Sequence, residues 1–420
     1  MLILKYSLRA IILLSLFTFY CCDKETNTNE NKEKEEEKPT IKYPVSKLES
    51  HSEINKTTSW YNTNKSFNEL FNIRKTNYFG FEMTPNGLLP FVQGTWSSSK
   101  SQYYYWPEVG MYLYTDLNGD GIKDLYAFYL KDPWPTNAKG LNLFCEYVKS
   151  PAIYDLQSGL TQVRKCVLSD IDNDKLNEVI LFSSGVDAIP FPGDSIGIFY
   201  PKKLLYEYLS DEIGYFHGGA AGDINNDGLN DIVAYSGSYP IRPVAYINSG
   251  NGKFRSVNEY FVGFGEQDNF YTVELFDINN DGKLDLLLGD KIIYQAAGIY
   301  NKLNAINLPL SDGLSVIDLA FFDFNEDGSF DILTMSVKEN YIGYNLDVFI
   351  NKGNTFTRAT DEYIENNFGT GVNNWIAWVR LFDYDKDGDV DIVGDGLYGD
   401  LLDKVIYWKN NGGKFVKVQQ

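Results

Sequence analysis

Short apolar runs recur along the chain from about residue 101 to its end, most of them four to six residues long and rich in Val, Ile, Tyr and Phe. Runs of this kind predict buried β-strands, and no helix-period segment of useful length competes with them. Runs enter a series of acidic loops at Met111–Tyr114, Val167–Leu168, Val273–Phe276, Leu319–Phe322 and Trp378–Phe382. Others leave the loops at Leu125–Leu130, Val179–Phe182, Ile232–Tyr235, Leu286–Leu288 and Ile332–Met335. Each acidic loop is therefore predicted to be a turn between two strands.

A second turn, built from asparagine and glycine, recurs downstream of these strand pairs. It occurs at Asn248–Phe254, Asn351–Phe356 and Asn410–Phe415. Asn and Gly suit a backbone with positive φ, and we expect the closing phenylalanine to begin a fourth strand. Each repeat thus contains four antiparallel strands.

The acidic loops have the spacing of a cation site. In the loop at 383–391, Gly388 at position 6 permits the positive-φ turn that winds a short loop around one ion. The expected ligands, at positions 1, 3, 5, 7 (through the backbone carbonyl) and 9, are Asp383, Asp385, Asp387, Asp389 and Asp391. Oxygen-only ligands in a flexible loop favour calcium over magnesium or a transition metal.

Five further copies of this loop precede it. In the same order of positions, their expected ligands are Asp116, Asn118, Asp120, Ile122 and Asp124 in loop one; Asp170, Asp172, Asp174, Leu176 and Glu178 in loop two; Asp223, Asn225, Asp227, Leu229 and Asp231 in loop three; Asp277, Asn279, Asp281, Lys283 and Asp285 in loop four; and Asp323, Asn325, Asp327, Ser329 and Asp331 in loop five. We expect five or six structural calcium ions.

Loop two departs from the pattern, because Lys175 replaces the glycine and Glu178 replaces the last aspartate. A cation beside the site, without the conformational freedom of glycine, should weaken or abolish metal binding there. The alternative for every loop is a turn in which Asp, Asn and Gly satisfy their own backbone without metal. The packed carboxylates argue against it, because they repel each other by roughly 4 kcal/mol per pair at about 4 Å and an effective dielectric constant of about 20.

The loops start 54, 53, 54, 46 and 60 residues apart, so this is a repeat protein. Four antiparallel strands per repeat predict an all-β fold, a β-propeller of four-stranded blades, over residues 101–420. Residues 43–100 lack an acidic loop but contain a hairpin pattern at 77–92, with a Pro85–Gly87 turn. They form either a degenerate first of seven blades, which the repeat length favours, or a cap on six blades. A β-solenoid is the rival architecture, although its repeats are shorter.

The charge balance agrees with metal sites. The formal net charge is −20, with 57 acidic against 37 basic residues, and many of the acidic residues belong to the loops. A nucleic-acid-binding protein needs a basic stripe, so the composition argues against nucleic acid as a partner.

Residues 1–21 are typical of a signal peptide, with Lys5 and Arg9 before an apolar run that is too short to span a bilayer. The run stops at two cysteines, as in bacterial lipoprotein signals, and we expect Cys22 to be lipidated; a signal without lipid is the alternative. Residues 22–42 then form an acidic, disordered tether. The sequence predicts an exported protein of the bacterial envelope, facing the surface and held to the membrane only by its lipid.

The other two cysteines, Cys145 and Cys166, lie in apolar runs. In an exported protein they either pair as a disulfide or remain ordinary packed residues, and the sequence leaves both open.

No catalytic residue is predicted. The chain has two histidines, His51 and His217, and His217 is expected to be a packed strand residue. No nucleophile elbow, phosphate-binding loop or zinc pattern occurs.

Aromatic residues make up 15% of the chain. The Trp375 and Trp378 pair and the Tyr103–Trp106 segment either stack on sugars or, as we favour, pack between blades. Trp134, between two prolines in a loop, is a candidate ligand contact.

The Asp-x-Asp/Asn-x-Asp-Gly-x-x-Asp loops, with the strands after them and the Asn-x-Gly turns downstream, resemble the FG-GAP/VCBS repeat family over roughly residues 105–420. That family includes the calcium-bearing propeller of integrin α subunits. The resemblance implies a propeller with calcium on one rim, used at cell surfaces for adhesion or recognition. We therefore expect a non-catalytic module that binds a macromolecular ligand, first a protein and second a glycan. The alternatives are a calcium-dependent polysaccharide lyase or hydrolase and a structural envelope lipoprotein.

Overall fold

The computed structural model describes residues 80–84, 87–91, 95–97, 102–104, 111–115, 117–120, 124–130, 140–146, 152–157, 160, 163–185, 193–237, 241–265, 268, 270–382, 384–385, 387–401 and 406–419. For the strands between residues 80 and 157, the description covers the backbone. The segments assigned from sequence to the signal peptide, Cys22, the tether and Trp134 lie outside the described residues.

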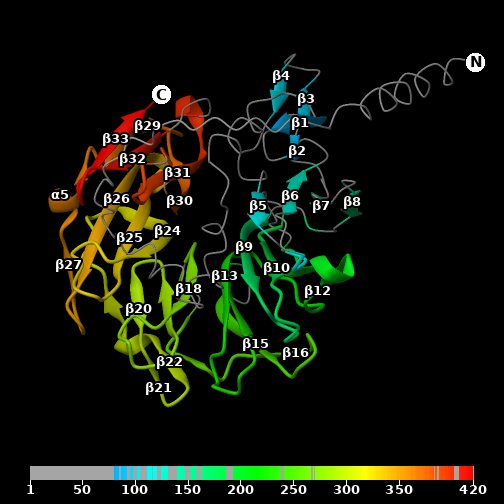
Figure 1. Ribbon diagram of the computed structural model, residues 1–420. Coiled ribbons are helices and arrows are strands. Elements are labelled where there is room, and N and C mark those ends of the chain that lie inside the picture. The colour runs from blue at the N-terminus through cyan, green and yellow to red at the C-terminus, as the bar shows by residue number, and fades with distance from the viewer. Residues whose placement is uncertain are drawn as a thin grey trace, which may run out of the picture. The chain divides into compact units, whose positions relative to one another are not determined.

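Within the described residues, six sheets of at least four strands follow one another along the chain, and their strands pair antiparallel except for β28 in the sixth (Figure 1). Sheet one contains β5 (Met111–Thr115), β6 (Asp124–Leu130), β7 (Gly140–Glu146) and β8 (Ala152–Gln157). Sheet two contains β9 (Val163–Ser169), β10 (Glu178–Ser183), β11 (Gly197–Tyr200) and β12 (Leu205–Tyr208). Sheet three contains β13 (Phe216–Gly222), β14 (Asp231–Ser236), β15 (Arg242–Asn248) and β16 (Phe254–Val257).

The later sheets carry additional strands. Sheet four contains β18 (Val273–Phe276), β19 (Asp285–Leu288), β20 (Lys291–Ile293) and β23 (Ile306–Asn307). Sheet five contains β24 (Leu314–Phe322), β25 (Asp331–Lys338), β26 (Ile342–Asn351) and β27 (Phe356–Arg358), with β29 (Phe368–Val372) paired to β26. Sheet six contains β30 (Ile376–Phe382), β31 (Asp391–Leu397), β32 (Ile406–Asn410) and β33 (Phe415–Gln419), with β28 (Ile364–Glu365) paired to β33.

Smaller elements complete the described chain. Strands β1 (Gly80–Thr84) and β2 (Gly87–Phe91) form one hairpin, β3 (Thr95–Ser97) and β4 (Gln102–Tyr104) another, and β17 (Phe261–Val262), β21 (Gln295–Ala296) and β22 (Ile299–Asn301) a three-stranded sheet. The helical elements are α5 (Thr360–Tyr363) and the 3₁₀ turns η3 (Pro201–Lys203), η4 (Lys302–Asn304), η5 (Glu339–Tyr341) and η6 (Gly399–Leu401). Within the described ranges, no helix has the length and apolar character needed to cross a bilayer.

The strand predictions are confirmed in detail. Strand β18 has the bounds read from the sequence, and Phe254, Phe356 and Phe415 begin the fourth strands β16, β27 and β33. The hairpin β1–β2 turns between Thr84 and Gly87, as the Pro-Asn-Gly pattern predicts. An all-β fold with repeated four-stranded sheets is therefore correct.

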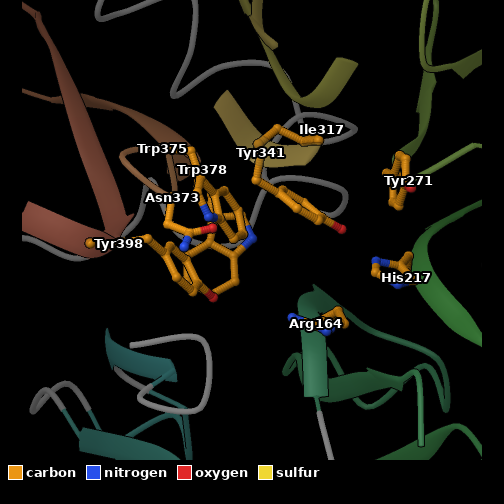
Figure 2. A pocket seen from close by; sticks show the side chains of 11 residues that line it. Arg164, His217, Tyr271, Ile317, Tyr341, Asn373, Trp375, Trp378 and Tyr398 are labelled. Atoms are coloured by element: carbon orange, nitrogen blue, oxygen red, sulfur yellow. The ribbon is translucent and has the colours of Figure 1, made fainter. Parts of the chain in front are cut away.

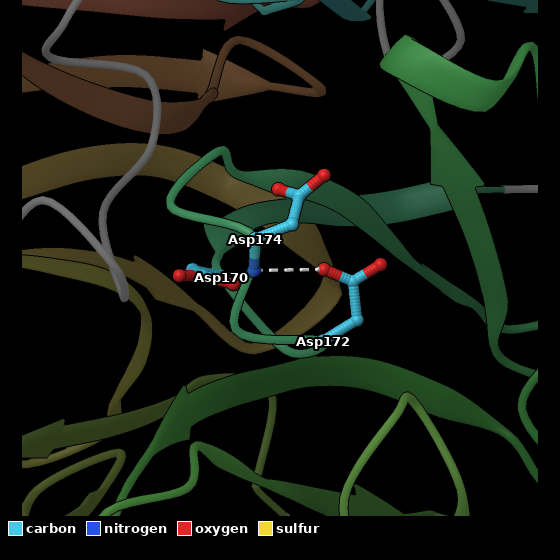
Figure 3. A group of neighbouring side chains, drawn as sticks. All are labelled: Asp170, Asp172 and Asp174. Carbon is cyan, nitrogen blue, oxygen red and sulfur yellow. Dashed lines mark hydrogen bonds between the residues drawn. The ribbon is translucent and has the colours of Figure 1, made fainter.

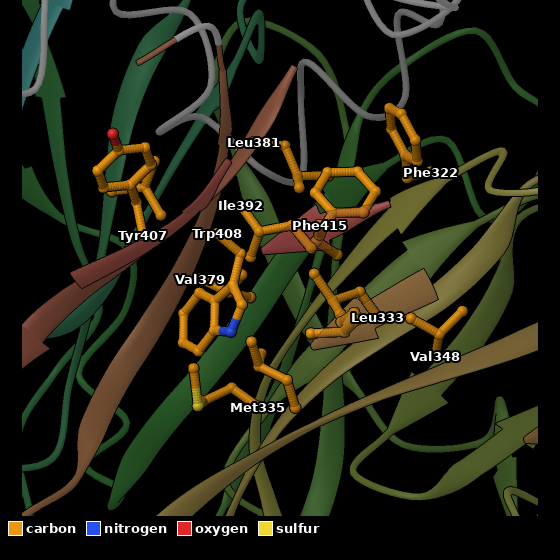
Figure 4. Close-up of a cluster of buried hydrophobic side chains, with 14 of the residues drawn as sticks. Phe322, Leu333, Met335, Val348, Val379, Leu381, Ile392, Tyr407, Trp408 and Phe415 are labelled. Atoms are coloured by element: carbon orange, nitrogen blue, oxygen red, sulfur yellow. The ribbon is translucent and has the colours of Figure 1, made fainter. Parts of the chain in front are cut away.

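The cores lie between consecutive sheets. Sheets two and three share one cluster, three and four the next, four and five a third, and five and six a fourth. In the fourth, Leu333 and Val348 of sheet five pack with Val379, Ile392 and Trp408 of sheet six (Figure 4). Both faces of a middle strand are buried in this way, which explains why the strands read as continuous apolar runs rather than as alternating ones.

A fifth cluster joins sheet two to sheet six. Leu168 and Phe199 of sheet two share it with Ala377 and Trp378 of sheet six and with Leu117 of loop one. Sheets two and six are therefore connected by a hydrophobic core of the same kind as the cores between sheets that are consecutive in sequence.

The approach of β13 to sheet two depends on a glycine. A Cβ atom at Gly219 would lie 2.0 Å from a ring carbon of Phe182, so no larger residue fits without a shift.

Candidate functional sites

Each acidic loop connects the first strand of a sheet to the second. Loops two to six connect β9 to β10, β13 to β14, β18 to β19, β24 to β25 and β30 to β31. Loop one lies between β5 and β6, and of its predicted ligands the structure describes Asn118, Asp120 and, in backbone, Asp124. Asp383 of loop six, with Asp116 and Ile122 of loop one, lies outside the described residues.

The first aspartate of loops three, four and five organises the turn. Asp223 accepts hydrogen bonds from the backbone amides of Asp227 at 3.1 Å and Gly228 at 2.8 Å. Asp277 makes the same pair at 2.9 and 2.8 Å, and Asp323 at 3.0 and 2.9 Å. The aspartates of these turns therefore satisfy backbone amides of their own loop, as the metal-free alternative requires. Because each carboxylate oxygen has a second lone pair, the same bonds leave oxygens available to a cation.

Positive φ at position 6 is confirmed wherever that position is described. The φ angles are 84° at Gly228, 84° at Gly282, 92° at Gly328 and 100° at Gly388. Lys175 of loop two has the same conformation, with φ of 72°, and its amide bonds Asp170 at 3.0 Å. Loop two therefore adopts the same backbone shape as the other loops. It does so with a lysine in a positive-φ conformation that is unfavourable for a residue with a Cβ atom.

The closing carboxylate at position 9 is buried and fixed by backbone. Asp231 is 0% exposed and accepts from the amides of Ile224 at 3.2 Å and Asn248 at 2.8 Å. Asp331 and Asp391 repeat this arrangement. Each such aspartate joins the start of its loop to the end of the third strand.

Burial raises the pKa of these closing carboxyls, and the other carboxylates of the loop raise it further. The pKa is about 8 for Glu178, about 7 for Asp231 and Asp285, and about 6 for Asp331 and Asp391. Five buried acids beside like charges need a counter-charge. An oxygen-rich site with this demand fits a divalent cation such as calcium.

Among the described residues, loop two brings three acidic side chains close together. One oxygen each from Asp170, Asp172 and Asp174 lies within 4.8 Å of the others (Figure 3). The Oδ1 atom of Asp170 is buried, with no hydrogen-bond partner among the described residues. These three side chains are the ones the sequence assigned to positions 1, 3 and 5.

Lysines that the sequence analysis missed lie against two loops. At loop two, Lys203 pairs with Asp172, and Lys202 with Asp174 at 3.2 Å. At loop six, Lys409 of β32 bridges Asp385 and Asp387. These ammonium groups compete with a metal ion for the same oxygens. The signal available in the sequence was the position of Lys409, directly before the Asn410 turn.

The turn asparagines have a second role that the sequence did not reveal. The side-chain amide of Asn248 donates to the carbonyl of Ile171 in the preceding acidic loop at 2.7 Å. Asn351 donates to Ile278 at 2.9 Å, and Gln295 takes the equivalent role toward Ile224 at 2.9 Å. In repeats three, four and five, one buried amide therefore connects the acidic loop to the preceding one.

A second group of charges is buried where the first strands approach each other. Lys165 of β9 forms an ion pair with Glu274 of β18, with side chains 10% and 1% exposed. Asp318 of β24 accepts from the amide of Val379 in β30 at 2.7 Å. Arg380 of β30 favours the ionised form of Asp318 and thereby opposes the rise that burial causes in its pKa, to about 6.

A cavity of about 480 Å³ lies at the other end of the first strands (Figure 2). Five of its lining residues lie six positions before the first aspartate of loops two to six: Arg164, His217, Tyr271, Ile317 and Ala377. Equivalent positions of five repeats thus meet at one cavity. At the strand rise of about 3.3 Å per residue, six residues place it roughly 20 Å from the acidic loops.

Several residues considered in the sequence analysis meet at this cavity. His217 lies in β13 as expected, with its ring 4.8 Å from that of Tyr215 and 5.1 Å from that of Tyr271, and it also lines the cavity. Trp375 and Trp378 both line the cavity, and Trp378 is mostly packed, at 8% exposed. Cys166 is a buried thiol in β9. The side chain of Cys145, in β7, lies outside the described residues.

Residues 223–288 and 323–394 match the profile of the FG-GAP-like repeat. Two stretches of the chain are therefore similar to this repeat. Each matched stretch begins at the first aspartate of an acidic loop, and the second continues through loop six into β31.

No curated protein matches the chain significantly. Among solved structures, it is similar to the extracellular domain of a protein described as a one component system, BT4673, from B. thetaiotaomicron. The identity is 13% and the TM-score 0.34, over 79% of this chain and 38% of that one. The match thus spans well under half of that structure.

Proposed function

We propose that this protein is an exported β-propeller, stabilised by calcium in its FG-GAP-like loops, that binds a macromolecular ligand without catalysis. The single observation that carries the proposal is the cavity to which the same position of five repeats contributes a residue. Equivalent positions of successive sheets converge in this way when the sheets are arranged around an axis.

The contacts between sheets support closure of the ring. Sheet two shares a core with Ala377 and Trp378 of sheet six and with Tyr398, which follows β31, and Leu117 of loop one lies in the same core. This contact brings the last sheet back to sheet two, as closure of a ring requires. Seven blades, the number that the repeat length favours, require β1–β4 to form one more blade, whereas their described backbone pairs as two separate hairpins.

The donor sets support calcium. Five loops place carboxylate oxygens at alternating positions around a positive-φ turn, and each ends in a buried acid whose pKa is raised by burial. The residues that would hold the ions are those at positions 1, 3, 5, 7 and 9 of each loop. The ions are structural in this proposal, because the loops connect strands within one sheet and lie away from the cavity.

The N-terminal sequence supports export and a lipid anchor at Cys22, with residues 22–42 as the tether. A recognition module needs an exposed surface presented away from the membrane, and the tether provides it.

Binding of the purified full-length chain to arrays of matrix proteins and polysaccharides tests the function. Saturable binding to a protein or a glycan, with no new reducing ends or cleaved peptide after prolonged incubation, is the expected result. Product formation would instead establish an enzyme. The absence of binding in both arrays would leave a structural envelope protein as the better account.

A further inference from the structure

The cavity wall contains loops that are held together by hydrogen bonds. The amide of Tyr398 donates to the carbonyl of Trp375 at 3.0 Å, and the amide of Asn373 donates to the carbonyl of Tyr341 at 3.1 Å. Asn373 and Trp375 lie in the longest repeat, whose additional residues include β28 and β29. The wall is therefore built before a ligand arrives, which reduces the entropy that binding costs.

One side of the cavity is aromatic. The rings of Trp375 and Tyr398 stack with their centroids 3.7 Å apart and their planes 10° apart, and the ring of Tyr341 lies 4.9 Å from that of Trp375. Figure 2 shows these rings, with Trp378, facing Arg164, His217 and Tyr271 across the open space. Aromatic faces carry partial negative charge and attract the C–H-rich face of a sugar ring.

The opposite side is polar. Arg164 is held by a hydrogen bond from its Nε to Ser184 at 3.3 Å. Tyr271, His217 and, near the aromatic side, Asn373 carry groups that both donate and accept hydrogen bonds. Burial lowers the pKa of His217, so its imidazole is neutral near pH 7. Neutral groups that can both donate and accept hydrogen bonds suit sugar hydroxyls, which also donate and accept them.

The charge of the lining is opposite to that of the protein. Among the described residues that line the cavity, Arg164 is charged and none is an aspartate or glutamate. The whole chain carries a net charge of −20. A guanidinium placed here, in an acidic protein, selects a ligand with a carboxylate, which it can bind through two parallel hydrogen bonds.

An independent observation concerns Tyr398. Its side chain is 9% exposed and its hydroxyl is buried, with no hydrogen-bond partner among the described residues. A buried hydroxyl without a partner destabilises the protein unless a ligand group meets it. This hydroxyl is on the ring that stacks against Trp375, on the same wall.

We propose that the cavity binds an acidic saccharide, a pyranose ring that carries a carboxylate within a polysaccharide. The inference rests on the recognition function proposed above and names its ligand class. The carboxylate bonds Arg164, the ring lies against the aromatic side near Trp375, and a hydroxyl bonds Tyr398. The cavity volume of about 480 Å³ lies within the range of about 300–1,000 Å³ typical of ligand pockets.

The test is calorimetric titration of the full-length protein, in calcium, with oligosaccharides of galacturonate, glucuronate, mannuronate and guluronate. The methyl ester of each serves as a ligand with the same ring and no charge. We expect saturable binding of at least one uronate and at least tenfold weaker binding of its ester. Binding of no uronate, or equal binding of acid and ester, would overturn the proposal.

Three variants assign the contacts. Arg164→Gln should weaken uronate binding about tenfold or more and leave ester binding unchanged, and Trp375→Ala should weaken both. Tyr398→Phe keeps the ring stacked on Trp375 and removes the unpartnered hydroxyl. If Tyr398 has a purely structural role, this variant should bind the uronate as tightly as the parent protein and have an equal or higher Tm. Loss of affinity in this variant supports a ligand contact. Tm values of all variants show that they fold.

Matched controls are Arg255→Gln and Tyr208→Ala, which change an exposed arginine and an exposed tyrosine away from the cavity. Both should bind like the parent protein. If a matrix protein binds instead of the uronates, and Arg164→Gln and Trp375→Ala do not affect it, the recognition function stands and the cavity proposal falls.

Discussion

The side-chain amide of Asn351 donates a hydrogen bond of 2.9 Å to the carbonyl oxygen of Ile278, 73 residues earlier in the preceding acidic loop. The same amide reaches Phe330 at 3.1 Å, within its own repeat. The backbone amide of Asn351 meanwhile bonds Asp331, the closing acid of loop five, at 2.8 Å. One residue thus connects two candidate metal loops and two sheets.

Asn351→Ala should therefore lower the free energy of unfolding by about 1–3 kcal/mol, because two buried carbonyls lose their donor. Chemical denaturation of the purified protein in calcium measures the effect. The exposed Asn304→Ala, in η4, is the matched control and should change stability by no more than about 0.5 kcal/mol. Equal stability of the two variants would remove the bridging role.

Lys175→Gly should stabilise the protein by about 1 kcal/mol, because a lysine at φ of 72° gives way to the residue that prefers this conformation. It also removes a positive charge from loop two, so calcium should stabilise this variant more than the parent. The reverse change, Gly228→Lys in loop three, should destabilise. A Cβ at Gly228 meets nothing within 4 Å, so steric clash does not confuse the comparison. No difference in either variant would contradict the strain argument.

Lys409→Met should have opposite effects with and without calcium. Lys409 lowers the pKa of Asp387 to about 2 and bridges it to Asp385. Without the lysine the two carboxylates repel, so stability in EDTA should fall. In calcium the ion no longer competes with the ammonium, so the gain in Tm on adding calcium should exceed that of the parent. Lys338→Met, at the far end of β25 from its acidic loop, should show the parental gain. A gain equal to that control would indicate that loop six binds no calcium.

The buried pair of Lys165 and Glu274 predicts a pH dependence. Burial raises the pKa of Glu274 from 4.5 to about 8, although Lys165 opposes the rise. The folded state therefore binds this proton more tightly than the unfolded state, and the contribution of Glu274 to the free energy of unfolding falls as pH rises from about 4.5 to 8.

Lys165→Met removes the group that opposes the rise, so the pKa of Glu274 should rise further and the fall in stability should continue above pH 8. At neutral pH the variant should cost about 1–3 kcal/mol, because the buried carboxyl loses its hydrogen-bond partner. Denaturation curves at pH 5, 6, 7, 8, 9 and 10, all in calcium, give the pH range of the fall. The double variant Lys165→Met with Glu274→Leu should flatten the slope and recover most of the stability. Parallel slopes in all three proteins would contradict the assignment to Glu274.

The local features of the fold were predictable from the sequence because they depend on neighbouring residues. A run such as Val273–Phe276 marks a strand by itself, and the phenylalanine after each Asn-Gly turn marks where the next strand begins. The glycines at position 6 likewise fix the shape of the loops. The matched FG-GAP-like repeats include these same loops.

The features that the sequence did not reveal depend on which strands meet across sheets. Lys165 and Glu274 are 109 residues apart, and no periodicity pairs them. Lys409 reaches Asp385 only because β32 pairs with β31 beside loop six. The residues that line the cavity could have been located in the sequence, because five of them lie six positions before an acidic loop. Their residue types differ from repeat to repeat, so no single one of them indicates a binding site.

The most direct test of calcium-stabilised repeats is the Tm of the full-length protein in 1 mM calcium and in EDTA. A site with a Kd of about 10⁻⁵ M adds about 2.7 kcal/mol at 1 mM calcium, so even two occupied loops should raise Tm by at least about 5 °C. Magnesium at the same concentration should have a much smaller effect. The account predicts a rise in calcium that is reversed by EDTA; an identical Tm in the two buffers would contradict it.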